Sequence, residues 1–326
     1  MRPDKLETLD QLMSSDQAEE ARAYFTRNYD MSWPSPFRCE ITERVPPAPR
    51  SDSTVWQPEG ATGLRGMLFR TVSAIDNSRR NRRFSEGPGH ESGLPVITQG
   101  DSWFAFPIIE PVDVSESLGR LTPVYSLACP GDEMRDICRG EQLDELAWAV
   151  EETKARNVAL SAGGNEMIGE EFPDILRPVD HAQSATDYLH LDRVNRKIAE
   201  LIDGFERIIQ HLVRIDPEIR VYAHSYDYPF PDVRQGRFMG RALDRAGIPP
   251  DRHRAVCSQI IDLLDNAMVT LTYRYPGTFS RVDFRGVSGA RPDAWADEVH
   301  LTTATAALAA RRLFDDIIRR NHGSHI

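Results

Sequence analysis

The chain of 326 residues contains few cysteines. Its four cysteines lie far apart, and no two of them form a Cys-x-x-Cys pair. Disulfide-stabilised domains and cysteine zinc sites typically show close, regular cysteine spacing. The sequence therefore predicts free thiols in a reducing compartment, at positions Cys39, Cys129, Cys138 and Cys257.

The chain also lacks an excess of positive charge. Its 39 Lys and Arg residues are outnumbered by 50 Asp and Glu residues, which gives a formal net charge of −11 at pH 7. A negative protein surface repels the phosphates of nucleic acids and of anionic headgroups. We therefore expect no nucleic-acid partner and no binding to an anionic membrane surface.

Long hydrophobic runs, internal repeats and low-complexity tracts are all missing. The first seven residues are rich in charge and lead into no continuous apolar segment. A membrane-spanning helix needs about 20 apolar residues, and a secretory signal needs a shorter apolar core behind a basic start. The sequence therefore predicts no membrane span and a cytoplasmic location.

What is present is an ordinary globular composition. Hydrophobic residues make up 40% of the chain and charged residues 27%. These fractions are typical of folded proteins, and the length allows one large domain or two of ordinary size.

The first 93 residues differ in pattern from the rest. Apolar residues at helical spacing predict an amphipathic helix over 5–27, and another helix is expected over 64–75. The proline-rich stretch over 33–63 predicts an irregular arm, because proline cannot donate ladder hydrogen bonds. We interpret 1–93 as an N-terminal extension that acts as a lid, a packing element or a subunit contact.

A basic run follows the second expected helix. Two interpretations are open: a docking patch for an acidic partner, or a solvated helix end where the macrodipole favours positive charge. The run consists of Arg79, Arg80, Arg82 and Arg83.

From residue 94 onward, short apolar runs alternate with longer segments of helical periodicity. This alternation predicts a mostly parallel sheet covered by helices, within one domain over 94–326. The five expected strands are 96–99, 124–128, 158–161, 219–224 and 279–284. The four long helices are expected over 141–156, 188–215, 252–272 and 302–320.

The first of these strands ends in Gly100-Asp101-Ser102. A serine in this position follows the carboxyl end of a strand, where open α/β sheets place their ligand crevices. Ser102 is therefore a candidate nucleophile. Asp101 is expected to support the turn, since neighbouring residues on an extended chain point in opposite directions.

Three further motifs fall at predicted loop positions. Gly131 follows the second strand, Asn165 follows the third, and Asp297 precedes His300 by three residues before the last helix. A serine nucleophile needs a base, and that base needs a third group to orient it. The spacing of Asp297 and His300 allows the carboxylate to reach Nδ1 while Nε2 faces Ser102.

The four motifs, in this order, resemble the SGNH or GDSL-type hydrolase superfamily over roughly residues 94 to 322. The resemblance implies a flavodoxin-like three-layer α/β/α sandwich and hydrolysis of esters, thioesters or acyl groups without metal or other cofactor. It implies a triad of Ser102, His300 and Asp297. It also implies an oxyanion hole formed by the N–H groups of Ser102 and Gly131 and the side-chain amide of Asn165.

Two positions depart from the pattern of that family. Trp103 follows the nucleophile where leucine is usual, and Glu166 replaces the aspartate that often follows the asparagine. The first places a large aromatic ring beside the nucleophile. The second leaves open how the turn at Asn165 is hydrogen-bonded.

Several aromatic residues near strand ends have two interpretations, an apolar substrate pocket or the core. The main candidates for the pocket are Trp103, Phe104 and Tyr226. His224, at the end of the fourth strand, is interpreted as a substrate contact, as an alternative base, or as a hydrogen-bonded histidine without a catalytic role.

The sequence therefore favours a metal-independent serine hydrolase that cleaves a small-molecule, lipid or saccharide ester through an acyl-enzyme. One alternative is a carbohydrate deacetylase or acyltransferase with the same triad. Another is an inactive scaffold that binds partners through its N-terminal extension. The oligomeric state and the acyl and leaving groups stay open, because loops decide them.

Overall fold

The computed structural model describes residues 3–14, 17–35, 38–44, 61–86, 93–106, 111–231 and 238–322. At its centre lies a five-stranded parallel sheet in the order β4-β3-β5-β6-β7. The strands are β3 (Val96–Gly100), β4 (Val124–Ser126), β5 (Asn157–Ser161), β6 (Arg220–His224) and β7 (Phe279–Val282). All five predicted strands are confirmed.

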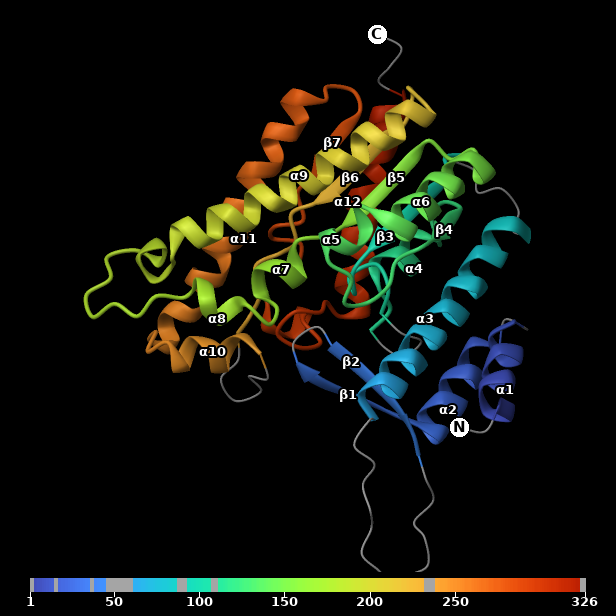
Figure 1. Ribbon diagram of the computed structural model, residues 1–326, viewed down its shortest axis with the longest axis horizontal. Coiled ribbons are helices and arrows are strands. Elements are labelled where there is room, and N and C mark those ends of the chain that lie inside the picture. The colour runs from blue at the N-terminus through green and yellow to red at the C-terminus, as the bar shows by residue number, and fades with distance from the viewer. Residues whose placement is uncertain are drawn as a thin grey trace, which may run out of the picture.

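Helices cover this sheet in two layers (Figure 1). On one face lie α4 (Val114–Leu118) and α12 (Thr303–His322), which contact each other. On the other face lie α6 (Gly140–Thr153), α9 (Leu191–Ile215) and α11 (Pro250–Arg274). Because both faces are covered, β3 and β5 are buried along their whole length, as parallel strands usually are. The predicted three-layer α/β/α fold is confirmed.

Shorter elements occupy the connections between these layers. They are α5 (Met134–Ile137), α7 (Gly164–Ile168), α8 (Phe172–Ile175), α10 (Met239–Arg245) and the 3₁₀ helices Ala185–Tyr188 and Pro292–Ala294. The chain leaves β3 toward β4 and then crosses back over β3 to β5. The order of strands therefore reverses beside β3, and ligand crevices form at such a point.

The N-terminal part folds differently from the prediction. Two helices, α1 (Pro3–Ser14) and α2 (Ala18–Asn28), replace the single expected helix over 5–27. The reason lies in the run Ser14-Ser15-Asp16, since serine and aspartate compete for backbone hydrogen bonds and favour helix ends.

The expected irregular arm is wrong for its first part. Strands β1 (Tyr29–Ser35) and β2 (Arg38–Glu43) pair as an antiparallel hairpin, with a register irregularity between Ser32 and Ser35. A proline is tolerated at such an irregularity in an edge strand, so Pro34 does not prevent pairing. Residues 45–60 of the expected arm lie outside the described residues.

Helix α3 (Ala61–Glu86) is longer than predicted and joins the N-terminal part to the sheet. Its residues Asn77 and Asn81 lie one turn apart and hydrogen-bond the exposed edge of β4. Asn81 accepts from the Ser126 N–H at 2.7 Å and donates to the Ser126 carbonyl at 3.0 Å, while Asn77 donates to the Ala128 carbonyl at 2.9 Å. These side chains satisfy backbone groups that an edge strand would otherwise present to another chain.

The N-terminal part also has a small hydrophobic core of its own. It is made by the buried residues Leu9, Met13, Ala21, Phe25, Tyr29, Ile41 and Val72. The division of the chain at residue 93 stays a prediction.

The basic run is neither a solvated helix end nor an external docking patch at Arg79 and Arg80. Both side chains are buried in ion pairs with acidic residues of the same chain. Burying a guanidinium is tolerated only when it is paired, and both arginines contact Asp76 on their own helix. Three arginines also surround Glu116 and lower its pKa to about 2, although burial alone would raise it.

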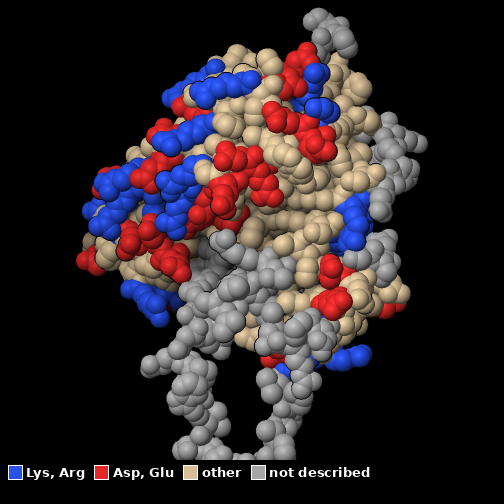
Figure 2. All heavy atoms as spheres, turned by 45° about the vertical axis from the view of Figure 1, so that its right-hand side comes forward, with Lys and Arg blue, Asp and Glu red and all other residues tan. Residues whose placement is uncertain are grey.

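The surface carries charges of both signs. On the face in Figure 2, Lys and Arg are interspersed with Asp and Glu and do not separate into large fields of one sign. Cys129, Cys138 and Cys257 are free thiols. In the parts of the chain listed above, no helix combines the length and the apolar character that crossing a membrane requires.

Candidate active site

The turn after β3 requires glycine at position 100. Gly100 has a φ of +140°, and a Cβ there would lie 2.0 Å from the Ser161 carbonyl oxygen on β5. The following Asp101 N–H donates to that same oxygen at 3.0 Å. Only a residue without a side chain allows this close approach, which turns the chain so that Ser102 follows the carboxyl end of β3.

Three predicted residues form one hydrogen-bonded chain. His300 Nε2 lies 2.9 Å from Ser102 Oγ, and His300 Nδ1 lies 2.8 Å from Asp297 Oδ2. A carboxylate accepts only, so Nδ1 carries the proton and Nε2 is the acceptor that faces the serine hydroxyl. Ser102 and His300 are both almost fully buried, at 4% and 3% exposure.

Asp297 is held by its own turn. Its Oδ1 accepts from the N–H groups of Val299 and His300, both at 2.8 Å. Burial by itself would raise the pKa of Asp297, but the His300 ring and these hydrogen bonds outweigh it and lower the pKa. The carboxylate therefore stays ionised, which fixes the tautomer of the imidazole.

The predicted oxyanion donors lie on the two neighbouring loops. Gly131 follows β4 with a φ of +86°, a left-handed conformation that favours glycine. Within the described part of the chain, the N–H groups of Ser102 and Gly131 donate to no protein acceptor. Asn165 is 5% exposed, and one of its two amide protons is used at 2.6 Å on the Asp132 carbonyl.

Glu166 connects these two loops. Its carboxylate accepts from the Gly163 N–H at 3.1 Å and from the Met134 N–H. The first contact caps α7, and the second reaches the loop after β4. Glu166 therefore hydrogen-bonds both loops from the position where the sequence departs from the SGNH pattern. Burial raises the pKa of Glu166 to about 7. The sequence alone left this hydrogen bonding open, because the partner is 32 residues away.

A buried polar network surrounds Asp101, next to Ser102. Asp101 Oδ1 accepts from the Ser161 hydroxyl at 2.6 Å and from the Trp103 N–H at 3.0 Å, and Oδ2 accepts from the Tyr226 hydroxyl at 2.5 Å. Asp101 therefore supports the turn, as the sequence predicts, and also ties it to β5 and to the segment after β6. Sequence reasoning missed Ser161, whose only signal is its place at the end of β5.

His224 belongs to this network and not to the triad. Its Nδ1 accepts from the Tyr226 N–H at 3.2 Å, so Nε2 carries the proton and donates to Ser161 Oγ at 2.8 Å. Complete burial lowers the pKa of His224 to about 3, and the ring is neutral at physiological pH. Of the three interpretations of His224 from the sequence, the hydrogen-bonded histidine without a catalytic role agrees with these contacts.

The neighbouring Tyr226 is strained. It has a φ of +62°, which is rare for a bulky side chain. This backbone conformation brings the Tyr226 N–H to the His224 ring and the Tyr226 hydroxyl to Asp101.

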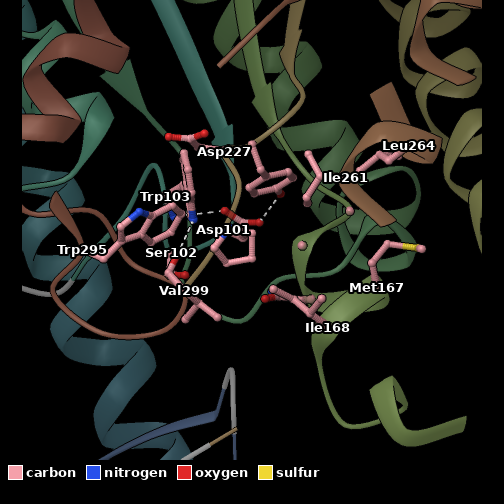
Figure 3. Close-up of a pocket in the computed structure, with 15 residues that line it drawn as sticks. Asp101, Ser102, Trp103, Met167, Ile168, Asp227, Ile261, Leu264, Trp295 and Val299 are labelled. Atoms are coloured by element: carbon pink, nitrogen blue, oxygen red, sulfur yellow. Dashed lines mark hydrogen bonds between the residues drawn. The ribbon is translucent and has the colours of Figure 1, made fainter. Parts of the chain in front are cut away.

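The predicted pocket aromatics divide into two groups. Trp103 and Tyr226 line a cavity beside Ser102, together with Trp295 (Figure 3). Phe104 and His224 do not line it: Phe104 is 1% exposed and packs against the His224 ring. Trp103 is both pocket wall and core, since its ring stacks on His224 and its Nε1 donates to the Val299 carbonyl at 3.0 Å.

Among the described residues, no group of three or more His, Cys, Asp or Glu side chains is arranged to hold a metal ion.

No protein-family model matches the chain, and no curated protein matches it. Among solved structures, it is similar to a lipase from a goat rumen metagenome, with 13% identity and a TM-score of 0.47 over 68% of this chain and 96% of the other. It is also similar to a putative platelet activating factor from Streptococcus pneumonia, with 14% identity and a TM-score of 0.48 over 80% and 100% of the two chains. A third similar structure is a family 3 carbohydrate esterase from Talaromyces cellulolyticus, with 14% identity and a TM-score of 0.41 over 69% and 97%.

Proposed function

We propose that this chain is a serine hydrolase that cleaves carboxylic esters through an acyl-enzyme. The observation that carries the proposal is the continuous hydrogen-bonded chain from Ser102 Oγ through His300 to Asp297, with contacts of 2.9 and 2.8 Å. Such a chain activates a hydroxyl that is otherwise a weak nucleophile at neutral pH.

Each residue then has a defined role. Ser102 Oγ attacks the ester carbonyl carbon while His300 Nε2 takes the hydroxyl proton. The same proton passes to the leaving alcohol, and the acyl group stays on Ser102 until water, deprotonated by His300, releases the acid. Asp297 orients the ring and stabilises the imidazolium.

The oxyanion of the tetrahedral intermediate needs donors that are in place before the reaction. The Ser102 and Gly131 N–H groups and the second amide proton of Asn165 are suitable, and Glu166 holds their two loops together. Loss of one such donor typically costs about 3 kcal/mol of transition-state stabilisation. These three donors would therefore stabilise the oxyanion, which the triad by itself does not do.

Covalent labelling by a fluorophosphonate probe tests the proposal. We expect the folded wild type to be labelled and to hydrolyse aryl esters, and Ser102→Ala to lose both properties while keeping its circular dichroism spectrum. Ser115→Ala is a matched control, because Ser115 is also buried but its hydroxyl hydrogen-bonds Thr98 within β3 and not a histidine. Near-full activity in Ser102→Ala would overturn the proposal, and a folded wild type without labelling would favour a scaffold.

A further inference from the structure

A small cavity adjoins Ser102. Its volume is about 20 Å³, and apolar side chains form most of its wall. Figure 3 shows Trp103, Trp295 and Val299 on the side of Ser102, with Met167, Ile168, Ile261 and Leu264 at the other end.

The position of His300 decides which part of an ester enters this cavity. The cavity touches Ser102 and Asn165 but not His300. His300 instead lines a separate hollow of about 10 Å³ that also touches Ser102, together with Phe106 and Leu301. Because His300 must protonate the leaving oxygen, the leaving group lies on the His300 side, and the acyl substituent points into the apolar cavity.

The size of the cavity limits the acyl substituent. A cavity needs about 10–15 Å³ in the same measure to hold one water, so 20 Å³ accommodates a group of about one or two heavy atoms. The side chains that form its walls cannot move apart to enlarge it. The Trp103 ring is fixed by its bond to the Val299 carbonyl and by stacking on His224, and Leu264 is fully buried in the core.

We propose that this cavity is the acyl site and that it restricts the enzyme to acetyl esters, an inference that rests on the proposed serine-hydrolase function. The acetyl carbonyl carbon bonds to Ser102 Oγ, the bond to the leaving oxygen breaks, and that oxygen takes the proton from His300. Water then adds to the acetyl carbon, the bond to Oγ breaks, and Oγ regains a proton as acetate leaves. The methyl group occupies the cavity throughout.

A chain-length series tests the inference. An added methylene in a hydrophobic pocket typically changes specificity by about 10-fold or more. For wild type we expect kcat/KM on p-nitrophenyl acetate to exceed that on the butyrate by at least about 10-fold and that on the hexanoate by about 100-fold.

Ile261→Ala enlarges the far end of the cavity, and Ile260→Ala is its matched control. Ile260 is fully buried on the same helix but does not line the cavity. We expect Ile261→Ala to raise the ratio of butyrate to acetate kcat/KM by about 10-fold, and Ile260→Ala to leave it within about 2-fold. If the alanine variant does not fold, Ile261→Val, which removes one methyl group, is expected to shift the ratio in the same direction by a smaller factor.

Two results would overturn the assignment of the cavity as the acyl site. One is an equal kcat/KM for acetate and hexanoate, and the other is the same change of the butyrate-to-acetate ratio in Ile261→Ala and Ile260→Ala. In both cases fluorophosphonate would still label Ser102. If the folded protein is not labelled and hydrolyses no ester, the proposed function is overturned, and this inference with it. The two failures are therefore distinguishable.

Discussion

Arg80 and Asp113 form a bidentate ion pair in the interior of the protein. Arg80 Nη2 lies 2.6 Å from Asp113 Oδ2 and Nη1 lies 3.1 Å from Oδ1, with both side chains buried. Arg80 Nη1 also donates to the Phe104 carbonyl, and Asp113 accepts from the Phe106 N–H. The pair therefore connects α3 to the segment that follows Ser102, and the Phe106 ring lies 4.8 Å from that of His300.

Removing this guanidinium leaves buried carboxylates without their partner. We expect Arg80→Met to lower the free energy of unfolding by about 3–5 kcal/mol. Arg83→Met is the control, because the Arg83 side chain is 45% exposed and its pair with Glu116 is of a kind that contributes about 1 kcal/mol or less. Urea denaturation measures the free energy of unfolding of both variants. Equal losses in the two variants would contradict a stabilising role for the buried Arg80–Asp113 pair.

The turn at Gly100 tolerates no side chain. A Cβ would lie 2.0 Å from the Ser161 carbonyl oxygen and would also force the strained φ of +140°. We expect Gly100→Ala to destabilise the protein by about 3 kcal/mol or more and to abolish labelling of Ser102. Gly247→Ala, where φ is +70° and nothing lies within 4 Å, should cost only about 1–2 kcal/mol. Thermal unfolding distinguishes steric overlap from backbone strain alone.

In the proposed mechanism, Asp297 orients His300 as the general base. In Asp297→Asn, a side-chain amide replaces the carboxylate that accepts from His300 Nδ1, so the ring is stabilised in the wrong tautomer. We expect kcat for an acetyl ester to fall by about 10⁴-fold with little change in thermal stability. Asp293→Asn, at an exposed position four residues earlier, should keep wild-type kcat.

His224 makes the protein sensitive to acid. Its pKa is about 3 in the folded protein and about 6.5 when unfolded, so the unfolded chain binds the extra proton and stability is lost as pH falls below 6.5. Between pH 6 and 4.5 we expect wild type to lose about 2 kcal/mol more than His224→Gln. His181→Gln, at an exposed position, should follow wild type. Denaturation curves at several pH values provide the measurement.

Glu166 gives stability a pH dependence opposite in sign to that of His224. Its pKa of about 7 in the folded protein exceeds the value of 4.5 for an unperturbed glutamate, so its contribution is complete below pH 4.5 and is lost as pH rises through 7. Relative to Glu166→Gln, wild type should lose up to about 3 kcal/mol between pH 4.5 and 8. The exposed Glu170→Gln should show no such difference, and parallel curves for all three proteins would refute the prediction.

The sequence by itself determined the sheet and the order of the motifs. The strand at Val96–Gly100 and the helix at Leu191–Ile215 follow from local periodicity, which a single chain displays without its partners. Ser102, Asn165 and His300 were found because each follows a strand or precedes a helix, and the ends of parallel strands meet at one edge of the sheet.

Only the tertiary structure decided what these residues touch. The contact of Trp103 with the Val299 carbonyl spans 196 residues, the pair of Arg80 with Asp113 spans 33, and the bond from Met134 to Glu166 spans 32. No local pattern encodes such pairs, since they depend on which elements the fold brings together. Burial, which makes His224 neutral and raises the pKa of Glu166, is likewise a property of the packed molecule and not of the residue.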